Sequence, residues 1–265
     1  MKKELLDNIR QVFLDMDGTI YRGTTLFDCT LPFLQFLTSR GIKYAFLSNN
    51  SSISTAMYVN KLNKMGIPAT ADNFYTSTHY AIDYLKEQLP QAKKLYLLAV
   101  PEVRAEFEAA GFVFEENEPD AFVLAFDKTL DYEKMCKGAY CMRRGIPSFA
   151  THPDVFCPTD KAEWLVDCGA MIACLETSTG CKFKVLGKPD PGLLHHAAAR
   201  YGINNMKQCL MIGDRLATDV AVGVNSGAVS CHIVDPSAEI VKVEGITPDF
   251  AVRDLGELQA FWENR

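Results

Sequence analysis

The sequence predicts an α/β protein built around a doubly wound parallel sheet, and three observations support this fold class. Short apolar runs of strand length alternate with amphipathic segments of helix length along the chain. Glycines follow several of the helical segments, at Gly41, Gly66, Gly111, Gly145 and Gly202, where helices commonly end. Small polar residues follow several of the apolar runs, and the ends of parallel strands are where such sheets bind ligands.

The composition sets the class of protein. The chain has 265 residues, of which 48% are hydrophobic and 23% charged, so it can form one large or two modest domains and is not disordered. A net charge of −6 gives no basis for binding a nucleic-acid polymer. No apolar stretch is long enough to span a membrane, and the N-terminus becomes acidic too early for a secretion signal, so we expect a cytoplasmic protein. Nine cysteines without a Cys-x-x-Cys motif favour reduced thiols.

The two ends of the chain read as one alternating unit. The first part predicts a strand at 11–14, a helix at 31–40, a strand at 43–47 and a helix at 54–64. The last part begins with a short apolar run at 183–186 and predicts strands at 208–212, 228–234 and 250–252, with helices at 192–201, 219–225 and 255–262. This spacing of strands and helices favours parallel pairing.

The middle of the chain predicts a second α/β unit. It has helices at 80–89, 102–110 and 131–144, and strands at 94–100, 121–125 and 146–150. It contains no second Asp-x-Asp turn, so we interpret it as an inserted domain and not as a repeat of the first unit. The predicted core therefore comprises residues 1–76 and 183–265, and the predicted insertion comprises residues 77–182.

Four polar clusters are the candidate functional residues. Asp15 and Asp17 follow the first apolar strand, where two carboxylates are costly unless a positive charge compensates them. Mg²⁺ prefers such oxygen ligands. The other clusters are Ser48 with Asn49 and Asn50, Lys188, and Asp214 with Asp219. In a doubly wound sheet, all four clusters can meet at one edge. Together they would suit phosphoryl transfer, which depends on positioning and on charge neutralisation.

These clusters lie in motifs that resemble those of the haloacid dehalogenase superfamily. The motifs are Asp-Met-Asp-Gly-Thr at 15–19, Leu-Ser-Asn-Asn at 47–50, Gly-Lys-Pro-Asp-Pro at 187–191 and Gly-Asp-Arg-Leu-Ala-Thr-Asp at 213–219. The segment 167–176, together with Gly-Lys-Pro at 187–189, is similar to that of NagD-type phosphatases, which include nucleotide, 4-nitrophenyl phosphate and pyridoxal phosphate phosphatases. The resemblance implies a Rossmann-like core with an inserted cap domain that selects the substrate.

The resemblance also implies roles for individual residues. Asp15 would be the nucleophile that carries an aspartyl phosphate, and Asp17 would be the general acid and base. Lys188 would neutralise the phosphoryl charge. Ser48, with Asn49 and Asn50, would bind the phosphoryl oxygens.

A magnesium site is implied by the same motifs. Asp15 and Asp214 would be its carboxylate ligands, and Asp17 would contribute its backbone carbonyl. Asp219 would orient either the water ligands of the metal or Lys188. The implied substrate is a small phosphate ester, and because relatives of this type form a dimer through the cap, the resemblance implies that option here as well.

The segment 150–158 is a candidate loop for choosing the substrate. It follows a predicted strand and is rich in residues that form turns. Its pattern Ala-Thr-x-x-Asp-x-x-x-Pro resembles that of pyridoxal phosphatases, which have a substrate-contacting histidine where this chain has Cys157. Asp154 and Cys157 are therefore candidate substrate contacts, with nucleotides or small sugar phosphates favoured over pyridoxal phosphate. A plain surface connection is the alternative.

Other interpretations remain open at this point. Lys188 alone would be a solvated lysine, Asp219 alone would be an acid at a helix N-terminus, and Asn49 and Asn50 would cap the following helix. A phosphotransferase or mutase shares the same motifs. A dehalogenase needs no metal and lacks an acid at the position of Asp17. A non-catalytic binding protein that kept the fold should have lost one of the charged residues, and none is missing.

Overall fold

The chain folds into two compact units. The computed structural model describes residues 2–159, 162–235 and 242–263. The first unit comprises Met1–Ser48, Val59–Tyr75 and Lys188–Arg265, and the second comprises Asn49–Tyr58 and Thr76–Gly187. The polypeptide therefore passes between the units at four places.

The first unit is built on a six-stranded sheet with the strand order β15-β14-β13-β1-β4-β5. Its strands are β1 (Gln11–Leu14), β4 (Lys43–Ser48), β5 (Phe74–Thr76), β13 (Cys209–Gly213), β14 (Val229–Ile233) and β15 (Phe250–Val252). β1 pairs in parallel with both β13 and β4, and β13, β14 and β15 continue in parallel. Crossovers between non-consecutive neighbours make the sheet doubly wound, which confirms the predicted fold class.

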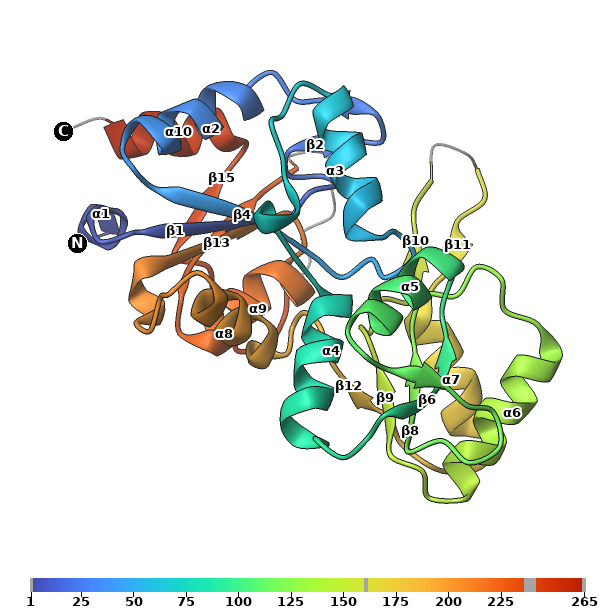
Figure 1. The fold of residues 1–265 in the computed structure, drawn as a ribbon. Helices are drawn as coiled ribbons and strands as arrows, with labels where there is room; N and C mark the ends of the chain where they lie inside the picture. Colours follow the sequence, from blue (N-terminus) through green and yellow to red (C-terminus); the bar gives the residue numbers. More distant parts are fainter. Residues whose placement is uncertain (1, 160–161, 236–241, 264–265) are drawn as a thin grey trace. The chain divides into compact units, whose positions relative to one another are not determined.

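Helices cover both faces of this sheet. Figure 1 shows α2 and α10 on one side of the strands, and α8 and α9 on the other. The helices of this part of the chain are α1 (Lys2–Asp7), α2 (Thr30–Ser39), α3 (Thr55–Lys64), α8 (Pro191–Arg200), α9 (Ala221–Ser226) and α10 (Leu255–Glu263). Val12, Phe13 and Leu14 are completely buried, as expected for a central strand covered on both faces.

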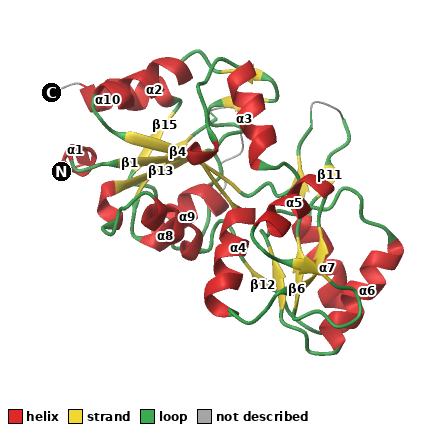
Figure 2. Ribbon diagram, in the orientation of Figure 1, coloured by secondary structure: helices red, strands yellow, loops and turns green. Residues whose placement is uncertain are grey.

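The second unit contains a five-stranded parallel sheet with the order β12-β9-β8-β6-β7. Its strands are β6 (Lys94–Leu98), β7 (Val113–Phe114), β8 (Ala121–Leu124), β9 (Ser148–Ala150) and β12 (Lys184–Val185). Its helices are α4 (Ser77–Gln88), α5 (Pro101–Ala109), α6 (Tyr132–Arg143) and α7 (Cys168–Thr179), as Figure 2 shows in red. Phe122, Cys141 and Met171 belong to the apolar core between the sheet and the pair α6 and α7.

One helix and two hairpins are among the elements that were not predicted from the sequence, as are α1, β5 and β7. Helix α7 begins after Asp167, whose side chain accepts a hydrogen bond from the backbone N–H of Cys168, and it ends at Gly180, which has a φ of 71°. Two hairpins are formed by strands of only two residues each, too short for a visible alternation of side chains. They are β2 (Tyr21–Arg22) with β3 (Thr25–Leu26), and β10 (Phe156–Cys157) with β11 (Leu165–Val166).

The bounds of the compact units differ in two places from the domains predicted from the sequence. Residues 49–58 group with the second unit, and the long part of this unit, predicted as 77–182, runs from Thr76 to Gly187.

All nine cysteines are free thiols. Among the described helices, none has both the length and the apolar character that crossing a membrane requires.

Candidate active site

Three adjacent parallel strands of the first unit end in candidate site residues. Asp15 directly follows β1, and its backbone N–H donates to the carbonyl of Ile212 at 2.9 Å. Asp214 follows the last residue of β13, and Ser48 is the buried last residue of β4. Because β1 lies between β13 and β4, the fold itself gathers these residues at the carboxyl edge of the sheet.

A tight turn after β1 brings the Asp15 and Asp214 loops close together. The carbonyl of Met16 accepts from the backbone N–H groups of Ile20 and Tyr21 at 2.9 and 3.3 Å. Gly18 has a φ of 87°, and a Cβ atom there would lie 2.2 Å from Oδ2 of Asp214. Glycine is therefore required both for the backbone conformation and for the space that the Asp214 carboxylate occupies.

Lys188 is a buried cation that joins Asp15 to Asp219. Its Nζ donates to Oδ1 of Asp15 and to Oδ1 of Asp219, both at 2.6 Å, and to the carbonyl of Leu47 at 3.1 Å. Burial lowers the pKa of the ammonium, but the charges of the two carboxylates outweigh burial and hold the pKa above its usual value. Lys188 therefore stays charged. Its burial excludes the interpretation as a solvated surface lysine.

Asp219 lies in a π-helical turn, Leu216–Val220, that precedes α9. The helix predicted from residue 219 therefore begins at Ala221, and the prediction of its start is wrong. The buried carboxylate of Asp219 receives Lys188 on Oδ1 and the backbone N–H of Arg215 on Oδ2 at 3.0 Å. The Asp219 carboxylate is therefore held by Lys188 and by the Arg215 N–H, and the π-helical turn places it beside Lys188.

Asp15, Asp214 and Asp219 form an acidic cluster in which one ligand atom from each lies within 4.8 Å of the others. Burial, followed by the charge of Asp219, raises the pKa of Asp15 to about 8 and that of Asp214 to about 6. Lys188 lowers both, but one ammonium against three carboxylates leaves two formal negative charges when all are ionised. The cluster therefore favours an additional cation.

The donor set fits a hard divalent cation. Oδ1 of Asp214 is buried and has no hydrogen-bond partner among the described residues, which is unfavourable for a carboxylate oxygen. Mg²⁺ prefers oxygen ligands, and its two positive charges would compensate the two negative charges of the cluster.

His232 on β14 is a residue that the sequence did not indicate. Its Nε2 lies 3.0 Å from the backbone carbonyl of Asp214 and fixes that loop.

Asp17 is exposed in the turn after β1, where its backbone bridges to Tyr21. It lies two residues beyond Asp15, in the same loop, and a side chain there can exchange protons with water. Asp17 therefore differs from Asp15 in environment, although the sequence presents the two acids as a pair.

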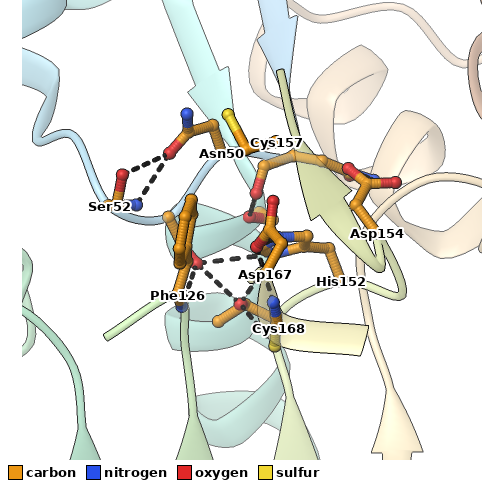
Figure 3. A network of polar contacts seen from close by, with 12 residues as sticks. Asn50, Ser52, Phe126, His152, Asp154, Cys157, Asp167 and Cys168 are labelled. Carbon is orange, nitrogen blue, oxygen red and sulfur yellow. Dashed lines mark hydrogen bonds and ion pairs between the residues drawn. The ribbon is translucent and has the colours of Figure 1, made fainter. Parts of the chain in front are cut away.

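The remaining predicted residues lie in the second unit. Nδ2 of Asn49 donates to Oδ2 of Asp154 at 3.3 Å, so these two predicted residues are brought together. Asn50 turns back on its own loop, because its Oδ1 accepts from the backbone N–H and the hydroxyl of Ser52 at 2.9 and 2.8 Å (Figure 3). Cys157 is half-buried in β10.

The segment 150–158 is only partly the surface loop that the sequence suggested. Thr151 and His152 are fully buried, and the side chain of His152 contacts Asp167. Neither His152 nor Asp167 was predicted as a functional residue. The available signal was two polar residues, Thr151 and His152, placed directly after a buried strand.

A doubly wound sheet with a lysine and carboxylates at its carboxyl edge defines an α/β enzyme of the kind that acts on anionic substrates. Residues 12–113 match the family model described as haloacid dehalogenase-like hydrolase, and residues 185–258 match the one described as HAD-hydrolase-like. The chain belongs to the haloacid dehalogenase-like hydrolases.

Known proteins resemble the chain over almost its whole length. The acid sugar phosphatase of Staphylococcus aureus is 30% identical over 247 residues, which are 92% of this chain and 94% of that protein. The structure of a 4-nitrophenylphosphatase from Thermotoga maritima has a TM-score of 0.90 at 36% identity and covers 98% of this chain and 99% of its own. NagD from Escherichia coli K-12 has a TM-score of 0.85 at 24% identity, covering 94% of this chain and 98% of its own, and supports the fold alone.

Proposed function

We propose that this protein is a Mg²⁺-dependent phosphatase that hydrolyses small phosphomonoesters through an aspartyl-phosphate intermediate. The observation that carries the proposal is the buried Lys188 held between Asp15 and Asp219, beside a buried Asp214 oxygen that has no hydrogen-bond partner among the described residues. A fixed cation beside a carboxylate nucleophile is what phosphoryl transfer requires, because it lets two anions approach each other.

In the proposed reaction, a carboxylate oxygen of Asp15 forms a bond to phosphorus while the bond to the leaving oxygen breaks. Asp17 gives its proton to that leaving oxygen, which departs as the alcohol. Asp17 then takes a proton from the water that attacks the aspartyl phosphate, and inorganic phosphate leaves with Asp15 restored. The exposure of Asp17 suits a group that exchanges protons in both half-reactions.

Ser48 and Lys188 would bind the phosphoryl oxygens, with the backbone N–H groups after Ser48 as further donors. Asp15, Asp214 and the backbone carbonyl of Asp17 would hold Mg²⁺, and Asp219 would orient Lys188. The bound ion would add positive charge beside the phosphoryl group.

The insertion and the names of the relatives support a proposal for the substrate class. Acid sugar phosphatase and 4-nitrophenylphosphatase are names for enzymes of small phosphate esters, which favours a sugar phosphate or nucleotide for this chain. The residues 77–182 would be the cap that covers the leaving group. The homodimer through the cap and the cytoplasmic location stay predictions.

A screen of phosphorylated metabolites tests this function directly. The purified protein should release inorganic phosphate from sugar phosphates, nucleotides and 4-nitrophenyl phosphate in the presence of MgCl₂, and the Asp15→Asn variant should release none. If phosphate appeared only when a second sugar phosphate was supplied as acceptor, a phosphotransferase or mutase would replace the hydrolase.

A further inference from the structure

A second polar cluster is buried in the second unit, outside the residues assigned to the chemistry. It consists of Ser51, Thr151 and His152, each fully buried, and Asp167, which is 3% exposed. Burying four polar side chains is unfavourable unless each has hydrogen-bond partners. Figure 3 shows His152 and Asp167 side by side in this cluster.

The hydrogen bonds of the cluster form one directed chain. The Asp167 carboxylate accepts, so His152 donates through Nε2 at 2.9 Å, and its Nδ1, 3.0 Å from Oγ1 of Thr151, is left to accept from that hydroxyl. Oγ of Ser51 accepts from the backbone N–H of Phe126 at 2.9 Å and lies 2.8 Å from Oγ1 of Thr151. Because the Thr151 proton goes to His152, the Ser51 hydroxyl donates to Thr151, and its oxygen also lies 3.4 Å from Nδ1 of His152. Each group donates and accepts in the same direction, from Phe126 to Asp167.

The backbone at the start of α7 also fixes the loop that carries Asp154. The backbone N–H of Asp167 donates to the carbonyl of Val155 at 3.1 Å, and that of Gly169 donates to the carbonyl of Asp154 at 2.7 Å. A Cβ atom on Gly169 would lie 2.1 Å from the carbonyl oxygen of Pro153, so only glycine permits this approach. The N-terminus of α7 thereby sets the position of Asp154, which in turn holds the side chain of Asn49.

Both routes end on the residues that follow Ser48. One runs from Asp167 through His152 and Thr151 to Ser51, and the other runs from the backbone at the start of α7 through Asp154 to Asn49. The hydroxyl of Ser77 adds a third anchor, because it donates to the carbonyl of Asn49 at 2.6 Å. The segment Asn49–Ser51 is therefore fixed by side chains that come from other parts of the second unit.

We propose that His152 and Asp167 are positioning residues that hold the segment Asn49–Ser51 in the conformation that binds the phosphoryl group. This inference rests on the proposed function, because that function assigns phosphoryl binding to Ser48 and the residues after it. Neither residue touches the substrate in this scheme. The effect of both residues passes through the Thr151 hydroxyl to Ser51.

Two substitutions at Thr151 separate the hydroxyl from packing. Thr151→Val keeps the shape but removes the hydroxyl that bridges Ser51 and His152, leaving only their longer direct contact at 3.4 Å. Thr151→Ser keeps the hydroxyl but removes a buried methyl group. Cys141→Ala is the matched control, because Cys141 is buried in the core of the same unit and is not part of the chain of hydrogen bonds. All three variants should lose some thermal stability.

The readouts are KM and kcat for 4-nitrophenyl phosphate with Mg²⁺, and competitive inhibition by inorganic phosphate. We expect Thr151→Val to raise KM and the inhibition constant together by about three- to tenfold, the range for one hydrogen bond, with a smaller change in kcat. Thr151→Ser and Cys141→Ala should keep both constants within about twofold of the original protein, a change below that range.

The outcomes separate this inference from the proposed function. If the unmodified protein releases phosphate but Thr151→Val matches Cys141→Ala in both constants, the positioning role is wrong and the phosphatase remains. If Thr151→Ser shows the same rise as Thr151→Val, packing and not the hydroxyl is responsible, and the inference also fails. If the unmodified protein releases no phosphate from any ester, the proposed function fails first and the positioning role fails with it.

Discussion

Lys188 and Asp15 are 173 positions apart in the sequence, and Nζ of the one lies 2.6 Å from Oδ1 of the other. Asp219 contacts the same ammonium at the same distance, so the lysine is shared by two carboxylates. Removing one partner of such a buried ion pair leaves an uncompensated charge, which is why each member is expected to affect both stability and chemistry.

Metal removal gives the first prediction. Phosphate release from 4-nitrophenyl phosphate should stop when EDTA is added and return with excess MgCl₂, because the three clustered carboxylates need a cation before they tolerate an anionic substrate. Colorimetric detection of nitrophenol measures this. Undiminished turnover in EDTA would rule out the metal-dependent mechanism.

The two aspartates after β1 should have separable roles. Asp15→Asn should abolish turnover while the fold is kept, because it removes the nucleophile at nearly constant shape. Asp17→Asn should reduce kcat by about 10²–10⁴-fold, the usual contribution of a general acid or base. The Asp17→Asn loss should be smallest for nitrophenyl esters, whose leaving group needs little protonation. Equal losses for alkyl and nitrophenyl esters would contradict the role of Asp17.

Lys188→Met should lower kcat/KM by about 10²–10³-fold, as expected when a preorganised donor to the transition state is lost. Asp219→Asn should cost less, because its amide oxygen can still accept from Lys188, although the charge and the acceptor for the Arg215 N–H are lost. Steady-state kinetics of both variants test this order. A larger loss for Asp219→Asn than for Lys188→Met would indicate that Asp219, and not Lys188, contacts the substrate or the metal.

The raised pKa values predict how stability depends on pH. Burial and the charge of Asp219 raise the pKa of Asp15 from 3.8 to about 8, so between these values the folded protein holds a proton that the unfolded chain has lost. The free energy of unfolding of the metal-free protein should therefore fall as pH rises from about 4 to about 8. Asp214, with a pKa of about 6, adds to the lower part of this window.

Magnesium should reverse this trend, because it binds the ionised carboxylates and releases their protons. The increase in Tm on adding MgCl₂ should be larger at pH 8 than at pH 6, as measured by thermal unfolding. Asp15→Asn serves as the control, since it removes the group that titrates at the upper end of the window. A metal-free Tm that rises between pH 5 and pH 8 would contradict the prediction.

Asp154 and Cys157 should affect different properties, although the sequence placed them in one loop. Asp154→Ala removes the acceptor of the Asn49 amide, so we expect activity to fall in similar proportion for all phosphate esters. Cys157→Ser lies in the β10 hairpin and should change the relative rates for sugar phosphates and nucleotides more than the rate for 4-nitrophenyl phosphate. A substrate panel assayed with both variants distinguishes the two effects.

The main sheet could be predicted from the sequence because its strands are continuous apolar runs. Val12, Phe13 and Leu14 are buried on both faces, and such runs are visible without a structure. Asp15 and Asp214 could be predicted to meet because they follow neighbouring parallel strands, whose carboxyl ends lie at one edge. Lys188 follows β12, a strand of the other sheet, so its contact with Asp15 does not follow from that topology.

What the sequence could not predict are contacts between side chains distant in the chain. Nothing near His152 in the sequence indicates that its partner is Asp167, since the pairing depends on where α7 begins. Asn50 is a different case, because its partner Ser52 is close in the sequence. Its side-chain oxygen accepts within a turn, and the residue type alone does not decide between this turn and ligand binding. Helix α9 begins at Ala221 because a π-helical turn, Leu216–Val220, occupies the predicted start at residue 219.

The placement of residues 49–58 has a practical consequence for exchanging caps between related enzymes. This segment precedes Val59–Tyr75 of the first unit, yet it belongs to the second, where Ser51 bonds to Thr151 and the backbone N–H of Thr55 bonds to Glu106 at 2.6 Å. A graft of residues 77–182 alone would replace these partners and leave the resident segment with mismatched hydrogen bonds. A chimera intended to transfer substrate preference must therefore carry two pieces of the donor, the short segment after β4 and the long insertion.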